Sequence, residues 1–139
     1  LHDAYFKRGA QTGPRTAPPA YPRHALKQRI NATLVYAMRR DAQGVPVDVE
    51  LVGAEIPAQW RARFDAATRQ AIQRWRLDPF EIDGQVVDCR LLVPVTFAVS
   101  PHRTPPARPI PVLAPYQSRL ADACPLPPVL DTEVAGTHL

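Results

Sequence analysis

The residues of this sequence that are able to do chemistry are few and widely spaced. The two cysteines, Cys89 and Cys124, admit a single intramolecular pairing. In an oxidising compartment they would form a disulfide that staples the C-terminal residues onto the segment around Cys89. In a reducing compartment Cys89 would be a buried thiol of a strand and Cys124 a free thiol. The cysteines therefore leave two alternatives open, a structural cross-link or two separate thiols.

Acid–base and metal chemistry find no suitable arrangement in the chain. No pair of histidines stands at the spacing by which one helix presents two metal ligands. The carboxylates near Pro79 and Gly84 are better explained as helix-ending and turn-forming residues, and neither a phosphate loop nor a nucleophile elbow is present. The sequence predicts no enzyme, no metal and no cofactor. The residues considered are His2, His24, His102, His138, Asp78, Glu81, Asp83 and Asp88.

An amphipathic helix is predicted between Pro57, which suits a first helical turn, and Trp75. Its apolar residues recur mostly at steps of three and four, which places them on one face. These residues are Trp60, Phe64, Ala67, Ala71, Ile72 and Trp75. The arginine-rich opposite face lacks interleaved aromatic residues for base stacking, and the net charge is only +4. The basic face is therefore expected to be solvated, and nucleic-acid binding is not predicted.

Three strands are predicted around this helix. Residues 33–38 alternate with period two, but either face could be the buried one. A polar turn ending at Gly44 leads to residues 45–51, whose valines and leucine alternate with Pro46, Asp48 and Glu50. A third strand is expected from about Gln85 to Ala98. Pro94 lies inside it and cannot donate a ladder hydrogen bond, so this strand is predicted to be an edge open to an extended peptide.

The prolines divide the chain into three parts. Of the 17 prolines, only Pro46, Pro57, Pro79 and Pro94 lie between Arg23 and Ser100. We therefore expect an N-terminal linker over 1–20, one compact domain over 21–100 and an extended proline-rich C-terminal tail over 101–139. Because the chain begins at Leu1, we expect a processed or excised product whose membrane anchor, if any, lies outside it.

Several short motifs, in this order and spacing, resemble the C-terminal domain of the TonB family of periplasmic energy transducers. Together they span a little over half of the chain, and family members commonly stop near Phe97. The motifs are Tyr21-Pro22 with Ala25, the turn at Gly44, Phe64-Asp65 with Ala67, the string RWRLDP over Arg74–Pro79, Gly84, Val93-Pro94-Val95 and Phe97.

The resemblance implies an α+β, two-layer fold, in which a short and a longer helix pack on a three-stranded antiparallel sheet. It also implies a docking site for an extended peptide, the TonB box of an outer-membrane receptor, captured by strand addition. Mapped onto this sequence, the site comprises Pro19, Ala20, Tyr21, Arg90, Leu91, Leu92, Val93, Pro94, Val95 and Thr96.

The resemblance further implies a periplasmic protein of energised outer-membrane transport, either anchored in the inner membrane or soluble after processing. Its inner-membrane proton-channel partners would bind a segment absent from this chain. The alternative is an envelope assembly module, similar to TolA, that uses the same sheet edge for homodimerisation or complex formation.

The C-terminal tail raises a further hypothesis. Pro109–Ala114 is extended by composition, and Cys124 would hold the tail beside Cys89, so the tail is expected to lie along the sheet edge and occupy the docking site. Residues 130–137 are also loosely similar to a TonB box. Removing residues 101–139 is therefore expected to permit or strengthen binding of a receptor-box peptide.

Overall fold

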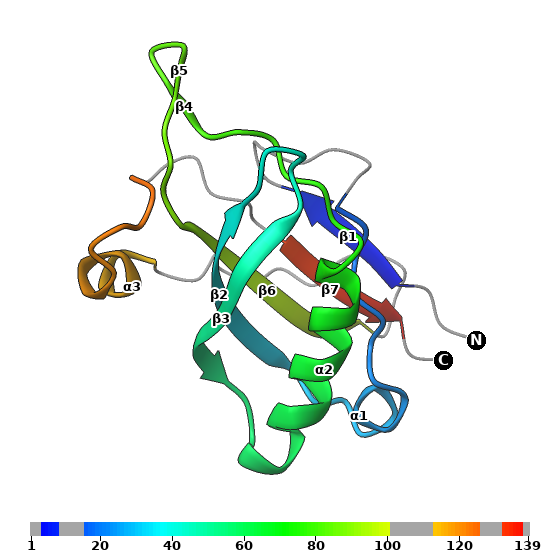
Figure 1. The fold of residues 1–139 in the computed structure, drawn as a ribbon. Helices are drawn as coiled ribbons and strands as arrows, with labels where there is room; N and C mark the ends of the chain where they lie inside the picture. The colour runs from blue at the N-terminus through cyan, green and yellow to red at the C-terminus, as the bar shows by residue number, and fades with distance from the viewer. Residues whose placement is uncertain (1–3, 9–15, 101–112, 126–131, 138–139) are drawn as a thin grey trace.

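The computed structural model of the chain describes residues 4–8, 16–100, 113–125 and 132–137. In this part of the chain, one sheet has five strands in the order β1-β7-β6-β2-β3, and a separate β4–β5 hairpin projects from it (Figure 1). The described elements are β1 (Ala4–Arg8), α1 (Arg23–Lys27), β2 (Ala32–Arg40), β3 (Pro46–Glu55), the short 3-10 helix η1 (Ala58–Trp60), α2 (Arg61–Ile72), β4 (Glu81–Ile82), β5 (Gln85–Val86), β6 (Leu91–Ser100), α3 (Ala114–Arg119) and β7 (Thr132–Thr137).

The predicted α+β fold is confirmed in the central part of the molecule. β2 pairs antiparallel with β3 on one side and with β6 on the other, so that Leu34 lies opposite both Ala54 and Val95. The longer helix α2 lies across one face of these strands (Figure 1), and the short helix α1 packs on the same core. The terminal segments then extend the three antiparallel strands by β7 and β1.

The turn between β2 and β3 also fastens the chain that follows α2. The side chain of Asp41 accepts hydrogen bonds of 2.9 Å from the backbone N–H groups of Gln43 and Val45. Gly44 has a φ of +85°, a conformation in which glycine is unstrained. Its carbonyl accepts a hydrogen bond of 2.7 Å from the N–H of Leu77. The motif Arg74–Pro79 is therefore tied to this turn by backbone contacts.

The core between the helices and the sheet is built around aromatic side chains. Tyr21, Phe64 and Phe97 form three edge-to-face contacts with centroid distances of 4.8–5.8 Å. Trp75 is fully buried, and its indole N–H donates to the carbonyl of Ala17 at 2.6 Å. Such aromatic pairs and satisfied polar atoms stabilise a core beyond the apolar area that they bury. The predicted apolar face of α2 accordingly faces the sheet.

Both faces of β2 are buried, which answers the question that its alternation left open. Leu34, Tyr36 and Met38 belong to the core under α2. Val35 and Ala37 instead form a second cluster with Leu92 and Leu113, and the partly buried Val52, Tyr116 and Leu120 pack against that cluster. Part of the C-terminal tail, including α3, therefore covers the second face of the sheet.

The third strand is shorter than the sequence suggested. Gln85 and Val86 pair with Glu81 and Ile82 in a hairpin of their own, and β6 begins only at Leu91. The turn residues Asp83 and Gly84 both have positive φ, 52° and 78°, as a type I′ turn requires. The predicted strand from Gln85 was wrong because this local Asp-Gly turn folds the first residues back onto the preceding segment.

Candidate functional site

The strand predicted to be an open edge lies inside the sheet. β6 pairs with β2 through Leu91–Phe97 and, on its other side, with β7 through Val95–Ser100. The β6–β7 pairing is parallel, whereas β2 pairs antiparallel with its neighbours. The edge prediction was wrong because the added strand comes from the C-terminal tail, more than thirty residues later in the chain. We use "outer side of β6" for the side opposite β2.

Two contacts show which backbone groups of β6 face this outer side. The N–H of Arg90 donates to the carbonyl of Asp122, and its carbonyl accepts from the N–H of Cys124, both at 2.7 Å. At the other end, the N–H of Val99 donates to Asn31, next to β2, at 3.0 Å. The direction of the backbone N–H and C=O groups alternates along a strand. Those of the even-numbered residues of β6 therefore point to the outer side. Pro94 is one of these residues, so its missing N–H does not disturb the ladder with β2.

The start of the outer side is held by a group of charged residues that sequence reasoning did not find. Asp122 forms ion pairs with Arg39 and with Arg90, the latter at 2.8 Å. Arg90 also reaches Glu50 at 3.1 Å, and Arg39 reaches Asp88 at 3.1 Å. No periodicity marks Asp122 in the sequence; its only signal is its place two residues before Cys124.

These pairs change the acidity of both main partners. The hydrogen bond to Asp122 is the largest cause that raises the pKa of Arg90. The same bond from Arg90 lowers the pKa of Asp122, with a smaller contribution from the charge of Arg39. Asp122 therefore remains ionised to lower pH than an isolated carboxyl group, so this contact between the tail and the sheet persists further into the acidic range.

Cys89 and Cys124 form a disulfide in the structure. Their Cα atoms are 5.0 Å apart and the two residues are separated by 35 positions in the sequence. Ala123 forms a parallel bridge with Arg90 directly beside this bond. The bond thus covalently fixes the tail next to the start of β6.

The predicted flank of the site is largely part of the core. Pro19 and Tyr21 are buried, and only Ala20 of the three predicted residues is exposed. The hydroxyl of Tyr21 donates to the carbonyl of Ile30 at 2.6 Å, just after α1. Tyr21 reaches β6 through its edge-to-face contact with Phe97, far from Arg90 at the other end of the strand.

The predicted docking residues of β6 offer their backbone and not their side chains. Arg90 is half-buried, whereas all the others are buried. Leu91, Val93 and Val95 point into the core under α2, and Leu92 points into the second cluster. Recognition at this strand would therefore depend on hydrogen bonds of the main chain. The buried residues are Leu91, Leu92, Val93, Pro94, Val95 and Thr96.

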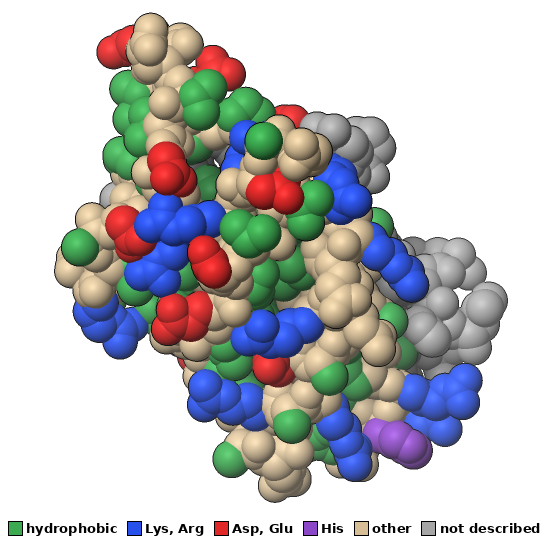
Figure 2. Space-filling view, in the orientation of Figure 1, with side chains coloured by type: hydrophobic (Ala, Val, Ile, Leu, Met, Phe, Trp, Pro, Cys, Tyr) green, Lys and Arg blue, Asp and Glu red, His purple; other side chains and the backbone are tan. Residues whose placement is uncertain are grey.

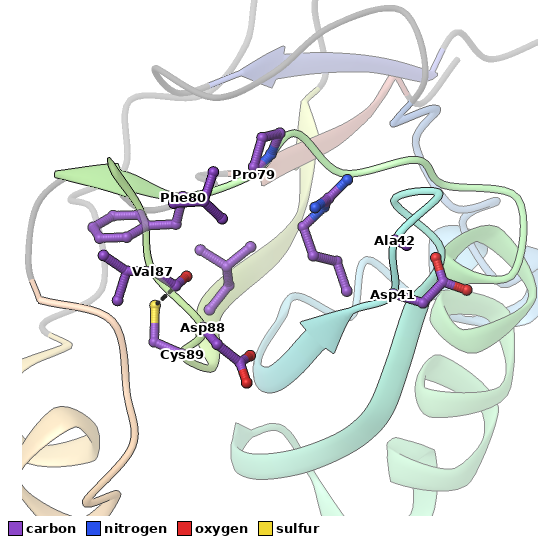
Figure 3. A pocket seen from close by; sticks show the side chains of 10 residues that line it. Asp41, Ala42, Pro79, Phe80, Val87, Asp88 and Cys89 are labelled. Atoms are coloured by element: carbon purple, nitrogen blue, oxygen red, sulfur yellow. Dashed lines mark hydrogen bonds between the residues drawn. The ribbon is translucent and has the colours of Figure 1, made fainter. Parts of the chain in front are cut away.

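A small cavity lies between the β2–β3 turn and the base of the β4–β5 hairpin (Figure 3). Its volume is about 220 Å³, below the roughly 300–1,000 Å³ usual for small-molecule sites. Figure 3 shows Phe80, Val87 and Cys89 on one side of it, and Asp41 and Ala42 on the other. Its charged lining residues are Arg40, Asp41 and Asp88, and Arg40 already donates to the carbonyl of Leu77. The described lining contains no paired nucleophile and base.

The charged surface shows no stripe of one sign on the face in Figure 2, where acidic and basic side chains are interspersed. Among the described residues, no group of three or more histidine, cysteine or carboxylate side chains is arranged to hold a metal ion. Within the same part of the chain, no helix is both long and apolar enough to cross a membrane.

Residues 17–99 match the family model of the Gram-negative bacterial TonB protein C-terminal domain. The chain belongs to this family. Protein TonB of Vibrio cholerae serotype O1 is 32% identical to it over 79 residues, which cover 57% of this chain and 31% of that protein. The chain thus matches less than a third of the length of this curated relative.

Membership of the TonB C-terminal family gives the motif residues a structural meaning. Tyr21, Phe64 and Phe97 are the three rings of the core, and Trp75 and Leu77 of the RWRLDP string are buried. These residues maintain the fold that presents β6. The tail after residue 99, with α3, Cys124 and β7, lies beyond the part that matches the family.

Proposed function

We propose that this domain captures an extended peptide, the TonB box of an outer-membrane receptor, by adding it as a strand to the outer side of β6. The docking groups would be the backbone of Arg90–Thr96, flanked by Pro19, Ala20 and Tyr21. The observation that carries the proposal is β7, a parallel strand seated on this side. Since β6 receives one strand there, its geometry suits strand addition.

The family supports the setting of this proposal. A TonB-type domain would act in the periplasm, in energised transport across the outer membrane, and would not be an enzyme. The proton-driven inner-membrane partners of the family would act through a segment outside this chain. The burial of the β6 side chains supports a site in which backbone hydrogen bonds supply the affinity.

Peptides whose backbone is N-methylated at alternate residues test strand addition directly. Alternate residues of an added strand point their N–H groups toward the sheet or toward solvent. Two versions of a synthetic receptor-box peptide would therefore be N-methylated at alternate residues, one at odd and one at even positions. Calorimetry with the full chain and with a chain ending at Pro125 measures both affinities. We expect one version to lose at least tenfold in affinity and the other to bind like the unmodified peptide; equal affinities would contradict strand addition.

Self-association is the second candidate function, and the outermost strands favour it. In the described structure β1 and β3 each pair on one side only. β3 is a poor surface for pairing, since Asp48 has a φ of +53° and the β2–β3 register shifts twice. Association would therefore use β1, or β6 after β7 has left. Mass measurements over rising concentrations would show dimers for this function, and monomers at every concentration would exclude it.

A further inference from the structure

The C-terminal tail follows β6 along its outer side, in the direction of β6, at two places. Ala123 lies beside Arg90 and Thr132 beside Val95, both in parallel orientation. These contacts are nine residues apart in the tail and five apart in β6, so the tail does not keep one continuous register. Both contacts occupy the side on which the proposed function places a receptor peptide.

The groups that β7 covers can be named from the alternation of β6. The outward N–H groups opposite β7 include those of Thr96 and Ala98, within the paired stretch Val95–Ser100. Arg90 is covered by Asp122 and Cys124. The outward groups of Leu92 lie between these two contacts and belong to neither pairing among the described residues. A second strand cannot pair with Thr96 and Ala98 while β7 is in place.

The tail is anchored at points independent of β7. The disulfide fixes Cys124, the ion pairs with Arg39 and Arg90 fix Asp122, and Leu113 is buried on the second face. Thr132 follows Cys124 by only eight residues. A short linker of this kind gives a tethered segment an effective concentration on the order of 1 mM. A segment with a Kd of about 100 µM would then suppress competing peptides about tenfold.

We propose that Thr132–Thr137 is a built-in ligand of β6, which must leave before another strand can bind there. The inference rests on the proposed function for the identity of the competitor, but the built-in ligand itself can be tested without any receptor. The segment Asp122–Cys124 would hold it in place as an anchor. Binding of a receptor peptide would then be an exchange of β7 for another strand.

The test uses a chain that ends at Pro125. This variant lacks β7 but keeps α3, the disulfide and the ion pairs of Asp122, so the second face of the sheet stays covered. A chain ending at Ser100 would instead uncover Val35, Ala37 and Leu92. A synthetic peptide of residues 130–139 is the probe, and a scrambled version of it is the control.

We expect the probe to bind the chain ending at Pro125 at least tenfold more tightly than it binds the full chain. In amide exchange measured by NMR, the N–H groups of Thr96 and Ala98 should be protected in the full chain. They should exchange faster in the shortened chain, and the probe should restore their protection. The N–H of Val99, which faces Asn31, is the internal control.

A second variant guards against misfolding of the shortened chain. Val134→Pro removes one N–H from the middle of β7 and disfavours the strand in an otherwise complete protein. It should bind the probe like the shortened chain. Equal probe affinity for all three proteins, with Thr96 and Ala98 equally exposed, would overturn the inference. A receptor-box peptide that binds none of them, while the probe binds both variants, would overturn the proposed function alone.

Discussion

At the scale of single residues, two glycines with positive φ have different structural roles. Gly44 has a φ of +85°, and a Cβ added there would lie 2.7 Å from the carbonyl oxygen of Leu77. Gly84 has a φ of +78°, but a Cβ there would meet nothing within 4 Å. Gly44 thus permits both a turn and the close approach of the chain after α2, whereas Gly84 permits a turn only.

The pair yields a matched prediction. Gly44→Ala should lower the free energy of unfolding by about 3 kcal/mol, since it adds a backbone clash to the cost of a left-handed conformation. Gly84→Ala should cost only about 1 kcal/mol, the conformational part alone. Urea denaturation of both variants measures the difference, and equal losses would mean that the contact with Leu77 yields without cost.

Asp122 makes the anchoring of the tail depend on pH. Because its pKa is lowered in the folded protein, chiefly by Arg90, its stabilising effect is present above the pKa of the unfolded state, about 3.9. That effect is lost as the pH falls through the lower pKa of the folded state. Asp122→Asn should therefore be less stable than the parent at pH 6, and the two should converge toward pH 2. A constant difference across this range would show that the ionised form contributes nothing.

At the scale of elements, α3 covers the face of the sheet that α2 leaves open, so that apolar side chains on both faces are buried. β2 has apolar side chains on both of its faces, and α2 covers only one of these faces. Leu113 and the first turns of α3 cover the other face, where the ring of Tyr116 occupies the space beside Gly53 that a Cβ would need. The proline-rich composition of the tail predicted extended chain, but burial of this face selects a short helix at Ala114–Arg119. Most of Pro109–Ala114, expected along the sheet edge, lies outside the described residues.

Shortening the apolar side chains beside α3 that bury the second cluster should destabilise the domain without changing β7. Leu113→Ala removes a buried side chain from the second cluster and should cost about 2–3 kcal/mol. Leu120→Ala, at the partly buried rim of the same cluster, should cost about 1 kcal/mol or less. Chemical denaturation provides both values. Equal and negligible losses would indicate that α3 does not protect this face in solution.

At the scale of the whole molecule, the disulfide connects the family-like domain to its additional tail. The bond closes a loop of 35 residues, and the chain-entropy model gives such a loop a stabilisation on the order of 3–4 kcal/mol. It also limits how far β7 can move from β6. Its opening should therefore lower stability and ease access to β6 together.

Reduction by a dithiol should lower the free energy of unfolding by about 3 kcal/mol. It should also raise the affinity of the full chain for the peptide of residues 130–139. Each disulfide takes up two electrons and two protons from the reagent and yields two thiols. The Cys89→Ser/Cys124→Ser double variant is the control, because its stability should not respond to the dithiol. No change in the parent on complete reduction would mean that the ion pairs of Asp122 and the α3 contacts already hold the tail.

The sequence by itself determined the central α+β fold. The alternation of residues 45–51, the turn residues Asp41 and Gly44 and the helical spacing from Trp60 to Trp75 all act between near neighbours, so their outcome is encoded locally. The family resemblance followed from the same local signals and was confirmed by the match over residues 17–99.

Only the tertiary structure decided which segment pairs with the outer side of β6. Pro94 predicted an edge strand, and this was wrong, because the segment that lies beside β6 depends on residues that are distant in the sequence. Asp122, Cys124 and Thr132 reach β6 because a covalent bond, two ion pairs and a buried apolar face bring the tail back to the sheet. Apart from proline, every residue type offers the same backbone donor and acceptor, so no sequence pattern could name their partner in advance.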